Sequence, residues 1–137
     1  MSLGDEVRYL RAFHGGGDLM EIEEAIGVEP GTLRRMEQRY RRVGEDDEEL
    51  AKIADYYGAS LEKLQWHRER YRKALSAYLQ EAMTSQTTAC FELRTGEQMT
   101  GRVCWWDLGS FGLETAEDEA LIVVQRHAVL DWEGAGS

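Results

Sequence analysis

The sequence predicts an α+β protein with an all-α first half, a linking helix and a strongly bent, five-stranded antiparallel sheet. From Asp5 to about Arg72, apolar residues recur at helical intervals and are interrupted by Gly or Pro. From Thr87 onward, β-branched and aromatic residues instead gather in short runs. We therefore expect two small domains: a helical domain over residues 1–64, and the linking helix with the sheet over residues 65–137.

The composition is typical of a folded cytoplasmic chain. An apolar fraction of 42% with four Trp, six Tyr and three Phe excludes general disorder. No run approaches the roughly 18 apolar residues of a membrane span, and the first residues lack the pattern of a signal peptide. Cys90 and Cys104 are too few for a disulfide framework and lack metal-ligand spacing. We expect reduced cysteines, no membrane partner and a cytoplasmic location.

Charge is distributed unevenly along the chain. The net charge of −10 argues against indiscriminate coating of nucleic acid, because Lys and Arg supply most non-specific affinity for phosphate. Residues 1–60 carry 8 basic and 14 acidic side chains, and residues 90–137 carry 3 and 9. Residues 61–89 carry 5 and 3, so only this middle segment is net positive.

Residues 18–37 have the pattern of two helices joined by a sharp turn. Asp18 can cap the first helix, Gly27 permits the turn, and Pro30 can begin the second helix at its favoured first position. The first helix is expected to carry the apolar residues Leu19, Ile22 and Ile26. Val28, in the turn, is expected to pack between the two helices.

The second helix is expected to have two unlike faces. At 3.6 residues per turn, its buried face carries Leu33, Met36, Glu37 and Tyr40. Its opposite face carries Arg35, Gln38, Arg39 and Arg42. A basic outer face suits a helix that enters a groove of DNA.

Over residues 5–64 the sequence resembles the Xre, or lambda-repressor-like, helix-turn-helix family. The resemblance rests on the Ile26-Gly27-Val28 turn, on residues 32–37, and on residues 50–64, which are similar to the family's fourth and fifth helices. It implies that the helix from Pro30 enters the major groove and reads bases near its amino end, where Gly31 also lies. The candidate DNA-binding residues are Thr32, Arg34, Arg35, Gln38, Arg39 and Arg42. A helix-turn-helix retained for protein contact remains the alternative.

The linking segment from Leu61 to about Met83 is expected to be one helix, or two with a slight break. Its apolar stripe consists of Leu64, Tyr71, Leu75, Tyr78 and Leu79, and basic residues lie beside it at Arg68, Arg70, Arg72 and Lys73. The stripe can pack on the flanking domains or on a helix of another subunit.

Five strands are predicted in the second half, at Thr88–Arg94, Met99–Trp106, Phe111–Thr115, Leu121–Gln125 and Ala128–Trp132. Thr95-Gly96 supplies a tight turn, and Gly101 permits the strong bend of a small sheet. The side chains of Phe91, Leu93, Met99 and Val103 can share one core.

Residues 74–133 resemble the Sm-like family in its Hfq branch. The shared features are a helix before the first strand, the hairpin over residues 93–103, Trp106-Asp107, and the turn over residues 126–129. The resemblance implies a β-barrel fold and rings, commonly of six subunits, formed by pairing the fourth strand of one subunit with the fifth of the next. It also implies single-stranded RNA at the pore, with candidate residues Trp106, Phe111, Gln125, Arg126 and His127.

The sequence does not contain a recognisable catalytic pattern. His14, His67 and His127 are far apart, and the glycines at 15–17 lack the Lys-Ser/Thr of a phosphate loop. We expect no catalytic residue, cofactor or metal site.

Three hypotheses follow. The first is a homo-oligomeric regulator of transcription that binds double-stranded DNA through the helix-turn-helix and forms a ring through the Sm-like domain. The second is an Hfq-like RNA-binding protein, and the third is a protein-assembly adaptor without a nucleic-acid ligand.

Overall fold

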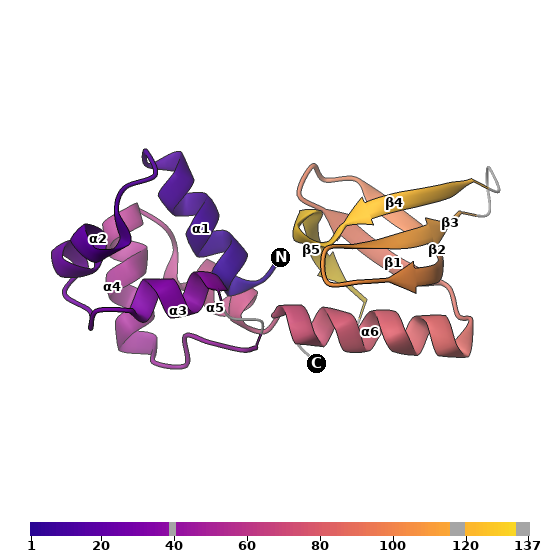
Figure 1. Cartoon of the computed structure of the whole chain (residues 1–137), viewed down its shortest axis with the longest axis horizontal. Helices are drawn as coiled ribbons and strands as arrows, with labels where there is room; N and C mark the ends of the chain where they lie inside the picture. The colour runs from indigo at the N-terminus through magenta and orange to yellow at the C-terminus, as the bar shows by residue number, and fades with distance from the viewer. Residues whose placement is uncertain (39–40, 116–119, 134–137) are drawn as a thin grey trace. The chain divides into compact units, whose positions relative to one another are not determined.

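The computed structural model describes residues 1–38, 41–115 and 120–133. Within these ranges the fold is α+β, with six α-helices followed by five antiparallel strands. Figure 1 shows their arrangement within each part of the chain. The chain divides into two compact units. One is Ser2–Tyr71, and the other is Arg72–Ser137 together with Met1. The division thus falls seven residues after the boundary expected at residue 64.

The first unit consists of α1 (Leu3–Phe13), α2 (Leu19–Ile26), α3 (Thr32–Gln38), α4 (Asp47–Tyr57) and α5 (Leu61–Arg68). Side chains cap several of these helices; Ser2 and Asp5 form a capping box on α1, and Asp46 accepts from two amides of α4. Its core is built from Leu3, Val7, Ile22, Leu33, Met36, Leu50, Ile53, Ala54, Tyr57 and Leu64.

The turn between α2 and α3 differs in detail from the prediction. Gly27 adopts the left-handed conformation that was expected, with φ of 87°. Asp18 occupies the amino-cap position, but its side chain makes no capping hydrogen bond. Pro30 was expected to begin the second helix, which instead begins at Thr32, because Gly31 between them has φ of 91° and cannot continue a right-handed helix. Tyr40 lies outside the described residues.

The linking segment forms two helices. After α5, helix α6 runs from Arg72 to Ser85, so the second of the two expected arrangements, two helices with a break, is present. The apolar stripe serves two cores, since Leu64 is buried in the helical core whereas Leu75 and Leu79 are buried against the sheet.

The sheet contains β1 (Ala89–Leu93), β2 (Gln98–Trp106), β3 (Ser110–Glu114), β4 (Leu121–Gln125) and β5 (Val129–Trp132). Its order is β4-β3-β2-β1-β5, and all neighbouring pairs are antiparallel. Since β4 pairs along its length with β3, and β5 with β1, these two strands form the edges. The described sheet is therefore open, not the closed barrel that we expected.

The bend of the sheet is located in β2. Residues 98–101 of this strand pair with β1, while residues 102–106 pair with β3. Gly101 lies at the change of partner, where an added β-carbon would collide with the carbonyl oxygen of Glu114. This close approach leaves no room for a side chain at position 101, which agrees with the expectation that Gly101 permits a bend there.

The core predicted for the hairpin is confirmed. Phe91 and Val103 are buried, and Leu93 and Met99 pack against the same cluster, which also receives Leu75 and Leu79 from α6. None of the helices in the described ranges is long and apolar enough to cross a membrane.

Candidate nucleic-acid interface

Helix α3 presents two faces, as its sequence predicted. Leu33 and Met36 are buried in the helical core, whereas Arg34, Arg35 and Gln38 are exposed. Two guanidinium groups and one side-chain amide, all hydrogen-bond donors, therefore lie on the solvent side of this helix. The other side of the helix is fixed by packing in the core.

A buried carboxylate fixes the carboxyl-terminal part of α3. Glu37 is 2% exposed, and Arg11 of α1 donates to both of its carboxylate oxygens over 2.8–3.2 Å. Arg8 adds a hydrogen bond from Nη2 to the Glu37 carbonyl oxygen at 3.2 Å. The hydrogen bonds to Glu37 raise the pKa of Arg11 above its usual value, because they favour the charged guanidinium. The pairing thus compensates the burial of the Glu37 charge and joins α1 to α3.

A second buried carboxylate fixes the other end of α3. Glu23 of α2 is 2% exposed, and its Oε2 accepts a hydrogen bond from the Leu33 amide at 3.1 Å. This amide lies in the first turn of α3, where no intrahelical carbonyl is available. The sequence did not predict this role for Glu23. The available signal was the position of Glu23 between Leu19 and Ile26 on the apolar stripe of α2.

Two of the other predicted DNA contacts are arranged differently. Thr32 is 2% exposed, so the prediction that it is presented to DNA is inconsistent with its burial. Arg42 is exposed and forms an ion pair with Glu69. Arg39 lies outside the described residues.

Beside α3 lies a groove of about 400 Å³ with mixed charge. Arg35, Arg41 and Arg42 line it together with the acidic residues Glu45, Asp46 and Glu49. Burial raises the pKa of Glu49, and the charge of Asp46 raises it further, whereas Arg35 lowers it. Part of the positive field of Arg35 is therefore balanced by carboxylates of the same unit.

Arg126, one of the five residues proposed for RNA, forms hydrogen bonds inside the sheet unit. It is 5% exposed and donates to the carbonyl oxygens of Asp107 and Arg72 and to Ser76 Oγ, each at 2.7 Å. These bonds join the end of β4 to α6 and to the turn after β2. The guanidinium is therefore directed into the protein, which is inconsistent with its predicted contact with RNA.

The aromatic candidates for base stacking are largely enclosed. Phe111 has no exposed surface, and its ring centre lies 4.7 Å from that of Phe91, so it is unavailable for stacking on a base. Trp106 is half-buried, and its Nε1 donates to Gln80 Oε1 at 3.0 Å. Only Gln125 and His127 of the five RNA candidates are exposed.

The Trp106-Asp107 pair has a local structural role. Asp107 Oδ1 accepts from the amides of Ser110 and Gly109, both at 2.8 Å, and closes the turn between β2 and β3. These two hydrogen bonds hold the pKa of the Asp107 carboxyl below its usual value.

No protein-family model matches the chain, and no curated protein matches it either. Within residues 1–38, 41–115 and 120–133, no group of three or more His, Cys, Asp or Glu side chains is arranged to hold a metal ion.

Proposed function

We propose that this chain is a homo-oligomeric nucleic-acid-binding regulator in which α3 contacts double-stranded DNA. The observation that carries the proposal is the exposed trio Arg34, Arg35 and Gln38 on a helix fixed at both ends by buried carboxylates. Arginine pairs with guanine edges and with phosphate, and glutamine with adenine edges. A helix that is already fixed loses less conformational entropy when it binds in a DNA groove than a mobile helix does.

In this proposal the sheet unit assembles the oligomer. In the described sheet, β4 and β5 each have one edge that pairs with no other strand, and pairing β4 of one copy with β5 of the next would join these edges, as in the rings of the Sm-like family. Several helix-turn-helix units on one oligomer would bind DNA together, which offsets the weak affinity of each acidic unit.

RNA is the second candidate ligand. An Hfq-like site would retain only Gln125 and His127 as exposed candidates, because Arg126 and Phe111 are used inside the sheet unit. The α3 surface therefore has more exposed candidate residues for DNA than the sheet unit has for RNA.

The test compares both ligands on the intact chain by fluorescence anisotropy, using a random-sequence DNA duplex and a single-stranded RNA. Arg35→Ala is expected to weaken duplex binding at least about fivefold and His127→Ala to leave it unchanged. The opposite pattern, with RNA affinity lost in His127→Ala, would assign the ligand to the sheet unit. Light scattering on the same samples tests the oligomer, and a monomer would contradict the assembly.

A further inference from the structure

A groove of about 610 Å³ runs along one side of α2 and the turn that follows it. It lies within residues 18–30 and does not include the outer face of α3. Its position therefore separates it from the trio of exposed residues assigned to DNA.

The apolar part of the groove is formed by Met20, Val28 and Pro30. Met20 is 71% exposed, whereas Ile22 on the other side of the same helix is buried in the core. A β-carbon added to Gly27 would meet nothing within 4 Å, so the groove stays open beside the turn. An exposed, flexible thioether next to a proline ring is suited to packing against varied apolar side chains.

The charged residues that line the groove are all acidic, and the exposed ones, Asp18, Glu21 and Glu24, are called its rim here. Asp18, Glu21 and Glu24 are exposed, and the residues that line the groove include no Lys, Arg or His. Within the described residues, none of these three carboxylates forms an ion pair with a basic side chain. The fourth carboxylate, Glu23, is turned inward onto the Leu33 amide. The rim thus presents three exposed negative charges beside the apolar side chains of Met20, Val28 and Pro30.

We propose that this groove binds a cationic amphipathic segment of a partner protein. An apolar side chain of the segment rests on Met20, Val28 and Pro30, and its Lys or Arg side chains face Asp18, Glu21 and Glu24. Charge complementarity selects this partner over nucleic acid, whose phosphates the rim repels. The proposal does not depend on DNA binding by α3, because the two surfaces use different residues.

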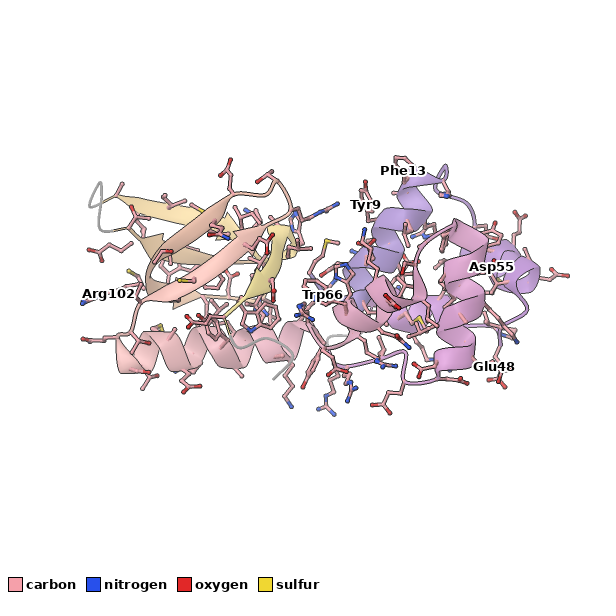
Figure 2. The ribbon with its side chains drawn as sticks, turned by 180° about the vertical axis from the view of Figure 1, so that it is seen from behind. Tyr9, Phe13, Glu48, Asp55, Trp66 and Arg102 are labelled. Atoms are coloured by element: carbon pink, nitrogen blue, oxygen red, sulfur yellow. The ribbon has the colours of Figure 1, made fainter. Side chains whose placement is uncertain are left out.

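The probe is a fluorescent amphipathic peptide of Lys and Leu, titrated with the full chain. Glu21→Lys with Glu24→Lys is expected to weaken binding at least about fivefold, since two attractions become repulsions. The matched control is Glu48→Lys with Asp55→Lys on α4, which makes the same change in net charge on exposed positions of the same unit (Figure 2). We expect this control to weaken binding less than about twofold.

Two further measurements separate a site from general attraction to an acidic protein. Met20→Ser leaves the charge unchanged and is expected to weaken binding about threefold, because the apolar anchor is removed. The Glu21→Lys, Glu24→Lys chain is expected to gain affinity for a Glu/Leu peptide. Equal losses of affinity in both double variants, or unchanged affinity in Met20→Ser, would overturn the proposal. Circular dichroism checks the fold of each variant, and Glu24→Gln repeats the test with a milder change.

Discussion

Arg11 of α1 donates to both carboxylate oxygens of the buried Glu37 on α3, at 2.8–3.2 Å. This pair is the closest charged contact between the first helix and the helix that we assign to DNA. It has consequences for both stability and binding, because the outer face of α3 is presented correctly only if its inner face stays fixed.

Removing Arg11 is expected to destabilise the helical unit more than removing an exposed arginine. Arg11→Ala leaves the Glu37 charge buried with only the more distant Arg8, whose Nε lies 3.9 Å from Oε1. We expect a loss of roughly 2–4 kcal/mol in the free energy of unfolding, measured with urea. Arg34→Ala, at an exposed position, is expected to change it by less than about 0.5 kcal/mol. Similar values for the two variants would show that the buried pair contributes little.

Arg126 is expected to act on stability. In Arg126→Ala, two part-buried backbone carbonyls and the buried Ser76 hydroxyl no longer have their charged donor. The expected loss of stability is about 2–4 kcal/mol, visible as a lower melting temperature of the sheet unit. His127→Ala, the exposed neighbour, should melt like the original chain. An Arg126→Ala protein with unchanged melting temperature but without RNA binding would restore the RNA assignment of Arg126.

Gly101 is expected to be intolerant of any side chain. Gly101→Ala places a β-carbon against the Glu114 carbonyl oxygen, so β2 or β3 must shift, at a cost of roughly 2–4 kcal/mol. Gly96→Ala provides the comparison, since its β-carbon meets nothing and only the positive φ of 89° is strained, at about 1–2 kcal/mol. Chemical denaturation of both variants shows which of them loses more stability. A larger loss in Gly96→Ala than in Gly101→Ala would contradict the close approach of residue 101 to the Glu114 carbonyl oxygen.

Tyr57 is expected to make the fold sensitive to alkali. Burial raises the pKa of Tyr57 from 10.0 to about 12. Between these values the unfolded chain releases the phenol proton while the folded chain keeps it, so stability present below pH 10 falls as the pH rises toward 12. The free energy of unfolding of Tyr57→Phe should fall less over this pH range, by up to roughly 2 kcal/mol, because phenylalanine cannot ionise. Tyr56→Phe, at a residue that is 45% exposed, should retain the fall in stability. If the free energy of unfolding depended on pH in the same way in Tyr57→Phe and in the original chain, Tyr57 would be excluded as the cause of the fall.

The elements of the fold were predictable because their determinants are local. The alternation in β2 and the positive φ of Gly27 and Gly96 depend on neighbouring residues, so strand and turn positions follow from short sequence patterns. The open edges of the sheet were not predictable in this way. Whether β4 meets β5 depends on strand geometry summed over the whole sheet, which no short pattern specifies.

The candidate site was predictable only in part, because the fate of a polar side chain depends on distant partners. Arg35 and Gln38 follow from helical periodicity and are exposed as expected, and Arg34, a candidate from the family resemblance, is exposed as well. Arg126 looked like a surface residue, but its acceptors come from positions 19 to 54 residues away. Glu23 likewise lies on an apolar stripe, and only the placement of α3 supplies the amide that it binds.

The salt dependence of duplex binding tests the DNA assignment of α3 most directly. For the intact chain, the logarithm of the association constant should fall linearly with the logarithm of salt concentration. In Arg34→Ala with Arg35→Ala the slope should decrease by about 1–2, because each phosphate that is no longer neutralised keeps close to one counterion. Arg102→Ala, an exposed arginine on β2 (Figure 2), should retain the original slope. An unchanged affinity and slope in the α3 double variant would contradict the proposed function.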